Sequence, residues 1–188
     1  PTLTIIVEPE PSTVGDISAA VLGKKGIKVI STTLRRNRPD ILNPKAKTTN
    51  YLNNILGKLQ ANAVGAQDAL FLNDQGEVCE LTGDNLFTIK NSVVSTPPIS
   101  CGILDGITRR LTLRIAKEMG LETREDPMTL HDVYTSDECF CTATRIELVP
   151  IVWVDGRQIG EGKPGPMTLG IIKRFLKIAN SEGAPVFV

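Results

Sequence analysis

The sequence has no net charge and no long apolar run. Its 21 lysines and arginines are balanced by 21 aspartates and glutamates, so no charge excess points to nucleic acid or to an anionic membrane as a partner. Hydrophobic residues make up 41% of the chain, yet no run approaches the roughly twenty apolar residues that a helix needs to cross a bilayer. The sequence therefore predicts neither nucleic-acid nor membrane binding, and it favours a small neutral ligand or a protein partner.

The residue spacings of common metal and redox sites are also absent. The four cysteines, Cys79, Cys101, Cys139 and Cys141, match neither a zinc ribbon nor a C-x-x-C motif. Cys139 and Cys141 would share one face of a strand, where burial as small apolar side chains is the main interpretation and a metal or redox pair is the alternative. The only histidine, His131, is expected on a polar helix face. We predict no metal site and reduced thiols, as in a cytoplasmic protein.

Strand and helix patterns come in runs along the chain and do not alternate strictly. Eight short segments bounded by turn residues are expected to be strands, and one of them, 27–32, alternates with a period of two. Four segments are expected to be helices, two from apolar residues at helical spacing, one from a capping box at Thr129–Asp132 and one from its initial proline. This order favours an α+β fold with mainly antiparallel strands in a curved sheet. The expected strands are 27–32, 69–72, 78–81, 86–89, 93–95, 138–142, 148–154 and 157–159, and the expected helices begin near residues 50, 105, 129 and 166.

A lysine and a glutamate have the properties of a pyridoxal phosphate site. Lys47 stands just before the helix that begins near Asn50, in the segment K-T-T-N-Y, and Glu80 opens the segment E-L-T-G-D-N-L-F. The chemistry of that cofactor needs a lysine amine that forms a Schiff base and a carboxylate that keeps the ring nitrogen protonated. A carboxylate buried on a strand would need a partner. The alternatives are Lys45 as the reactive lysine and Glu80 as a solvent-exposed residue of an edge strand.

Together these segments resemble the class IV aminotransferases, the fold-type IV family that includes branched-chain aminotransferase, D-amino acid aminotransferase and aminodeoxychorismate lyase. The likeness covers most of the chain and is strongest to the branched-chain enzymes. It implies the large C-terminal domain of the D-amino acid aminotransferase-like fold, with curved, mainly antiparallel sheets and flanking helices. It also implies that residues 1–25 are the remnant of an N-terminal small domain and linker, with Leu3–Val7 as its last strand, and that residues 26–188 are the C-terminal PLP-binding domain.

The resemblance assigns three residues to the cofactor, pyridoxal 5'-phosphate. Lys47 begins the K-x-x-N segment of the family and is the expected catalytic lysine. Glu80 is expected to accept a hydrogen bond from the protonated ring nitrogen. Tyr51 is expected to bond the phenolic oxygen of the cofactor, with burial in the core as the alternative.

Two further segments are implied in phosphate and substrate binding. The G-I-T-R segment leads into a helix, whose N-terminus attracts an anion, so Ile107 and Thr108 are expected to bind the phosphate through backbone amides and the Thr108 hydroxyl. The T-A-T-R segment matches a small-residue loop of the family, so Thr144 is expected to bind both phosphate and substrate. Arg145 stands where a small residue is usual. It either binds an acidic group of the substrate or points to solvent.

The activity that the resemblance implies is transamination between a branched-chain or other hydrophobic amino acid and 2-oxoglutarate. The partners would be a small-molecule amino acid and a 2-oxo acid, in a cytoplasmic homodimer. One alternative is D-amino acid aminotransferase or aminodeoxychorismate lyase activity on the same fold, and another is a noncatalytic assembly fragment. Because the N-terminal domain of the family supplies a phosphate-binding arginine and walls of the substrate pocket, we expect the truncated chain itself to be inactive.

Overall fold

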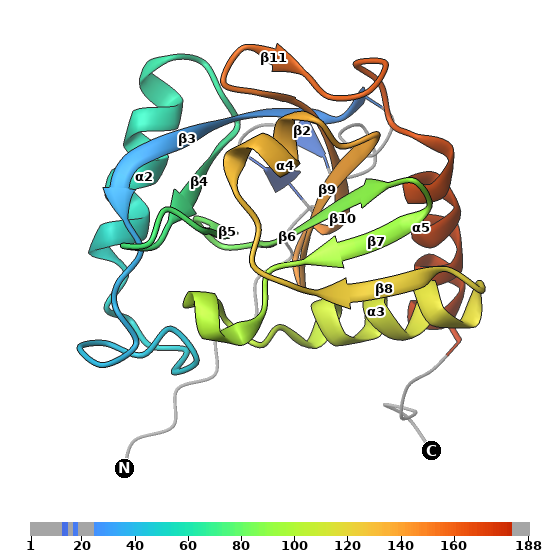
Figure 1. The fold of residues 1–188 in the computed structure, drawn as a ribbon, viewed down its shortest axis with the longest axis horizontal. Coiled ribbons are helices and arrows are strands. Elements are labelled where there is room, and N and C mark those ends of the chain that lie inside the picture. Colours follow the sequence, from blue (N-terminus) through green and yellow to red (C-terminus); the bar gives the residue numbers. More distant parts are fainter. Residues whose placement is uncertain (1–12, 15–16, 19–24, 182–188) are drawn as a thin grey trace.

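Six strands of the chain close into a ring. The computed structural model describes residues 13–14, 17–18 and 25–181 (Figure 1), and it contains a nine-stranded sheet and the short pair β1 and β2. The ring follows the pairing order β3, β4, β5, β6, β9 and β10, and β10 pairs again with β3. The strands are β1 (Thr13–Val14), β2 (Ile17–Ser18), β3 (Ile27–Arg35), β4 (Asp68–Leu72), β5 (Val78–Leu81), β6 (Asn85–Lys90), β7 (Val93–Thr96), β8 (Glu122–Glu125), β9 (Glu138–Ala143), β10 (Glu147–Val154) and β11 (Arg157–Gln158).

One parallel crossover sets the position of the site. β3 runs parallel to both β4 and β10, whereas the other pairs of the ring are antiparallel. Parallel neighbours cannot be joined by a tight turn, so the chain between β3 and β4 passes outside the sheet. That connection contains α2 (Leu52–Ala63) and the segment with Lys47. The crossover therefore brings the K-T-T-N-Y segment back over the end of β3.

The helices cover two different sides of the ring. Figure 1 shows α3 and α5 together at the lower right, and α2 on the opposite side. The outer face of β6 and β9 packs on α3 and α5 through an apolar cluster in which the rings of Phe87 and Phe140 stack 4.9 Å apart. A second apolar cluster fills the interior of the ring of strands, and it includes Val133 of the short helix α4. The helices are α3 (Ile107–Glu118), α4 (Leu130–Tyr134), α5 (Pro166–Ala179) and the 3-10 turn η1 (Ile99–Cys101).

Most of the predicted elements are present. Each expected strand is confirmed with shifts of a few residues at its ends, and each expected helix forms. Thr129 and Asp132 make a capping box at the start of α4, and all four cysteines are buried free thiols. His131 is exposed, and no group of metal-binding side chains occurs among the described residues. The predicted strand Leu3–Val7 lies outside the described residues, as does nearly all of the 1–25 remnant.

The apolar side of helix α2 faces away from the sheet, and a side made of smaller residues packs on it. Leu52, Ile55, Leu56 and Leu59 are 67%, 51%, 42% and 56% exposed. The face that packs on the sheet is made of Asn54, Gly57 and Ala61. A β-carbon on Gly57 would lie 2.6 Å from Phe71 Cζ, so the helix approaches the sheet too closely for a larger residue. The apolar stripe of α2 therefore faces away from the sheet.

No helix among the described residues is both long enough and apolar enough to cross a membrane.

Candidate active site

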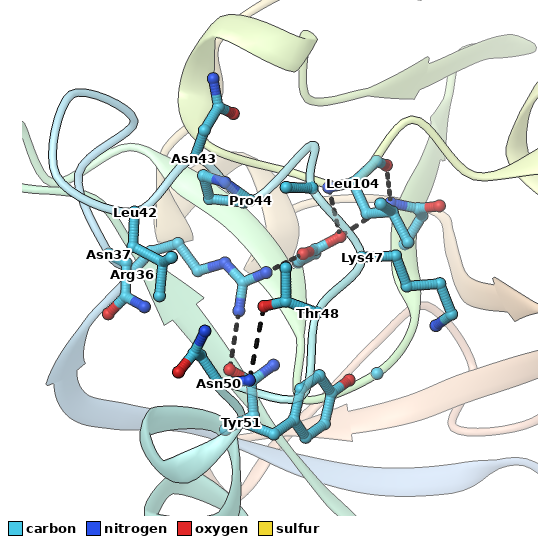
Figure 2. A pocket seen from close by; sticks show the side chains of 15 residues that line it. Arg36, Asn37, Leu42, Asn43, Pro44, Lys47, Thr48, Asn50, Tyr51 and Leu104 are labelled. Atoms are coloured by element: carbon cyan, nitrogen blue, oxygen red, sulfur yellow. Dashed lines mark hydrogen bonds and ion pairs between the residues drawn. The ribbon is translucent and has the colours of Figure 1, made fainter. Parts of the chain in front are cut away.

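A pocket lies where the crossover segment passes the ends of β3, β5 and β6 (Figure 2). It brings together side chains that are far apart in the sequence. Three of its residues, Lys47, Tyr51 and Glu80, are predicted site residues. The pocket is also lined by Arg36, Asn85 and Leu104.

Glu80 is a buried acidic residue in the lining of this pocket. Its side chain is 6% exposed, so the solvent-exposed alternative is wrong. One carboxylate oxygen forms an ion pair with Arg36, and the other accepts hydrogen bonds from Asn85 Nδ2 at 2.9 Å and from the Leu104 backbone amide at 3.0 Å. Burial raises the pKa of Glu80 to about 7, while Arg36 and the Leu104 amide oppose that rise. The carboxylate therefore has the partner that its burial requires.

Arg36 is a pocket residue that no sequence motif singles out. It directly follows β3, and its guanidinium contacts three separate segments of the chain. Nη1 donates to Asn54 Oδ1 at 3.1 Å, Nε donates to the Gly102 carbonyl at 3.1 Å, and Nη2 bonds Glu80. Because a buried Glu80 needs a partner, the sequence predicts that some basic side chain lies next to it. The sequence does not say which of the 21 lysines and arginines provides it.

Lys47 and Tyr51 line the pocket from the crossover segment. Figure 2 shows the side chains of both residues extending to the same side, away from Arg36. The Tyr51 hydroxyl donates to the Thr82 carbonyl at 2.7 Å, and the residue is 41% exposed, so it is not a buried core tyrosine. Burial and the charge of Glu80 raise the pKa of this hydroxyl. Lys45 is exposed and does not line the pocket, which favours Lys47 as the reactive lysine.

The N-terminus of α3 lies beside Asn85. Gly106 is the N-cap residue and makes no side-chain cap, and a β-carbon on it would overlap Asn85 Oδ1. The first N–H groups of a helix lack intrahelical acceptors, so the amides of Ile107 and Thr108 are able to bind an anion. Ile107 is exposed and Thr108 is buried. The close approach fits a phosphate cradle next to Glu80, because Asn85 also donates to the Glu80 carboxylate.

Thr144 and Arg145 do not line this pocket. Both are exposed in the turn between β9 and β10. Strand register brings the turn close, since Asn85 pairs with Glu80 on one side and with Thr142 on the other. The buried Thr142 hydroxyl has no hydrogen-bond partner among the described residues, which leaves it free for a bound group.

Arg145 lies close enough to Asp84 to affect its titration. Burial raises the pKa of Asp84 to about 7, the nearby carboxylate of Asp68 adds to the rise, and the charge of Arg145 opposes it. Asp84 belongs to the turn that joins β5 to β6, next to Glu80 and Asn85. An arginine here adds positive charge beside the candidate site.

The donor set as a whole fits pyridoxal phosphate. It combines a buried carboxylate for the ring nitrogen, a lysine amine for the aldehyde, and an uncapped helix start for the phosphate. Glu80, Lys47 and Tyr51 face one pocket, and the start of α3 adjoins it through Asn85. The chemistry of this cofactor makes use of both the lysine and the buried carboxylate.

Comparison with known proteins agrees with this geometry. The family model for amino-transferase class IV matches residues 1–154. A Methanocaldococcus jannaschii protein that is itself only predicted to be a branched-chain-amino-acid aminotransferase is 43% identical over the whole of this chain, which spans 62% of that relative. The crystal structure of Escherichia coli branched-chain amino acid aminotransferase has a TM-score of 0.86 and 34% identity, and the match covers 91% of this chain and 55% of that one.

A third relative carries a bound form of the cofactor. The T.th. branched-chain amino acid aminotransferase, complexed with N-(5'-phosphopyridoxyl)-L-glutamate, has a TM-score of 0.79 and 36% identity, and the match covers 82% of this chain and 52% of that one. The chain therefore spans between about half and three fifths of these relatives. Class IV aminotransferases depend on pyridoxal phosphate. Since the family model matches well over half of its residues, the chain belongs to the class IV aminotransferases.

Proposed function

We propose that the full-length protein transfers amino groups between a branched-chain or other hydrophobic amino acid and 2-oxoglutarate, with pyridoxal phosphate as cofactor. The observation that carries the proposal is the buried Glu80 carboxylate in a pocket that Lys47 also lines. The names of the relatives support branched-chain substrates. The glutamate adduct of the T.th. enzyme supports 2-oxoglutarate, because glutamate is the amino form of that oxo acid.

Each pocket residue has a distinct role in the proposal. Bound pyridoxal phosphate supplies an aldehyde that links to amines and a ring that withdraws electrons. Lys47 would hold the aldehyde when no substrate is present, and its amine would move a proton on and off the α carbon of the substrate. Glu80 accepts the hydrogen bond of the ring nitrogen. Tyr51, whose hydroxyl donates to the Thr82 carbonyl in this structure, would donate to the phenolic oxygen of the bound cofactor.

Phosphate and substrate binding are assigned to two segments, the start of α3 and the turn between β9 and β10. The backbone amides of Ile107 and Thr108, with the Thr108 hydroxyl, bind the phosphate at the start of α3. Thr144 binds phosphate and substrate from the turn after β9. Arg145, in the same exposed turn, binds the acidic side chain of the dicarboxylic substrate.

The assembly is proposed to be a cytoplasmic homodimer. The exposed apolar stripe of α2, which includes Leu52 and Leu59, is a surface that a second subunit would cover. Four buried cysteines without a disulfide are consistent with a reducing compartment. The 188-residue chain alone is proposed to be inactive, because its relatives have substantial length beyond the matched part.

The test is an amino-transfer assay of the full-length protein with 2-oxoglutarate as acceptor. We expect glutamate to form with L-leucine, L-isoleucine and L-valine, and we expect the Glu80→Gln variant to turn over far more slowly at saturating cofactor, because an amide does not balance a protonated ring nitrogen. Product formed only with D-alanine, or pyruvate released from aminodeoxychorismate, would replace the proposal with one of the related activities. A protein without cofactor absorbance would be a noncatalytic assembly module. Amino transfer by the 188-residue chain alone would refute the inactivity of that chain.

A further inference from the structure

Arg36 is held more firmly than a simple counter-ion requires. Its side chain is 9% exposed. Nε, Nη1 and Nη2 donate to acceptors from three different segments, namely Gly102, Asn54 and Glu80. The guanidinium carbon also lies 5.9 Å from the centre of the Phe71 ring. An arginine fixed in this way keeps its charge at one oxygen of Glu80 and has little freedom to leave it.

Both oxygens of the Glu80 carboxylate accept hydrogen bonds in the structure. Oε1 bonds Arg36, while Oε2 accepts from Asn85 and from the Leu104 amide. All three contacts are donors, and donors favour the ionised carboxylate. Burial acts in the opposite direction, since it raises the pKa of this group to about 7. Arg36 is the strongest of the influences that oppose the burial.

A hydrogen bond between a buried carboxylate and a pyridine nitrogen has two possible proton positions. In a low-dielectric site the neutral arrangement, a carboxylic acid beside an unprotonated ring, avoids separating charge. A cation fixed against the carboxylate reverses this preference, because it stabilises the carboxylate anion in place. The protonated ring is the form that withdraws electrons most effectively.

We propose that Arg36 is a positioning residue that acts through Glu80 to keep the shared proton on the ring nitrogen of the cofactor. The inference rests on the proposed assignment of Glu80 to that nitrogen. Asn54 supports Arg36 from α2 by accepting from Nη1.

Other charged groups also face Glu80 and have to be kept constant in a test. Lys47 from the crossover segment and Arg109 from α3 both favour its ionised form. Asp84 in the turn after β5, and the hydroxyl of Tyr51, are in turn affected by the charge of Glu80. Of these groups, Arg36 is the one with a direct ion pair to the carboxylate.

The test measures the proton directly, by the nitrogen-15 chemical shift of ring-labelled pyridoxal phosphate bound to the full-length protein. The wild type is expected to give a protonated ring nitrogen from about pH 6 to 8. In Arg36→Gln we expect a large share of the unprotonated form, and in Arg36→Lys, which keeps the charge without the planar fork, a partial return to the protonated form. Arg38→Gln is the matched control, because Arg38 is exposed and pairs with Asp40 and Asp74.

A second measurement covers the case in which the Arg36 variants bind no cofactor. In the cofactor-free protein, the carboxyl carbon of Glu80 is followed by carbon-13 NMR as the pH is raised. Loss of Arg36 is expected to move the midpoint upward by about 1–3 pH units, and loss of Arg38 to leave it in place. A midpoint that is the same in wild type and Arg36→Gln would overturn the inference.

The outcomes separate this inference from the function on which it rests. A wild type without a protonated ring nitrogen, or a Glu80→Gln variant with the same nitrogen shift as the wild type, would refute the assignment of Glu80. A wild-type shift that Glu80→Gln changes and Arg36→Gln does not change would leave that assignment standing and overturn the role of Arg36.

Discussion

Asn85 Oδ1 occupies the position that a β-carbon on Gly106 would need. The same asparagine donates to Glu80 Oε2 and to the Leu104 carbonyl, each at 2.9 Å. Glycine at the N-cap of α3 therefore lets one side chain join the carboxylate of the candidate site to the helix start that is proposed to bind phosphate. The two parts of the site have their relative position fixed through this contact.

Gly106→Ala is expected to disturb both parts of the site at once. The added methyl group has to displace Asn85, which we expect to cost about 1–3 kcal/mol of unfolding free energy and to weaken cofactor binding. Urea unfolding and cofactor titration of the full-length protein measure the two effects. Gly170→Ala in α5 is the control. A β-carbon added there would lie 3.2 Å from the flexible end of Met119, and alanine is favourable in a helix interior. Equal effects of both substitutions would contradict the role of the Asn85 contact.

The sequence predicts the elements well because their patterns are local. A preceding turn marks β5 at Val78–Leu81, and Thr129 with Asp132 marks the start of α4 by a capping box. β8 cannot be recognised from the sequence, because its residues, Glu-Thr-Arg-Glu, carry no apolar pattern and its strand conformation comes from pairing with β7. Propensity has little weight in such a strand.

Long-range contacts account for the features that could not be predicted from the sequence. The partner of Glu80 is 44 residues away, at Arg36, and only the parallel crossover of β3 and β4 brings them together. The apolar stripe of α2 predicts the helix correctly, but it does not say that the smaller residues Gly57 and Ala61 form the buried face. In both cases the three-dimensional arrangement decides between options that the sequence alone leaves equal.

The apolar stripe of α2 is expected to form part of the subunit interface. The double variant Leu52→Glu and Leu59→Glu puts two charges on residues that are 67% and 56% exposed, so folding is little affected while burial against a partner becomes costly. Analytical ultracentrifugation of the full-length protein is expected to show a dimer for the wild type and a monomer for the variant. Leu169→Glu, on the exposed side of α5 and 43% exposed, is the control. A variant that remains dimeric would place the interface elsewhere.

Asp84 is expected to make the cofactor-free protein less stable as the pH rises. Burial and the charges of Asp68 and Glu80 raise its pKa to about 7, above the ordinary value of an aspartate. A carboxyl group whose pKa is raised by folding favours the folded state at low pH, and this contribution is lost as the pH rises towards 7. Asp84→Asn removes the titration, so we expect the variant to gain on the order of 1–2 kcal/mol relative to wild type between about pH 5 and pH 8.

Urea unfolding at several pH values between about 5 and 8 measures this difference. Asp74→Asn, at an exposed position, is the control and should follow the wild-type curve. Parallel curves for the wild type and Asp84→Asn would mean that Asp84 does not titrate in this range. Glu80 titrates in the same direction and is present in both proteins.

Arg145→Ala is expected to weaken binding of the dicarboxylic substrate selectively. The loss of one charge-assisted hydrogen bond costs about 1.5–3 kcal/mol, which corresponds to about a tenfold or larger rise in KM for 2-oxoglutarate. The KM for L-leucine should hardly change, since leucine has no acidic side chain. Arg124→Ala on β8 is the control, because Arg124 is exposed and pairs with Glu122 on its own strand. An equal rise in KM for both substrates would mean that Arg145 does not bind the acidic group.

Lys47 is expected to be the residue that holds the cofactor. Its side chain lines the pocket with Glu80 and Tyr51, whereas Lys45 is exposed outside it. Borohydride reduction of the full-length protein loaded with pyridoxal phosphate, followed by peptide mass mapping, should place the pyridoxyl group on Lys47. Lys45→Ala should keep the adduct and Lys47→Ala should lose it, with both variants folded, because both lysines are exposed in the segment ahead of α2. An adduct on Lys45, or one that survives in Lys47→Ala, would show that the crossover presents a different amine to the cofactor.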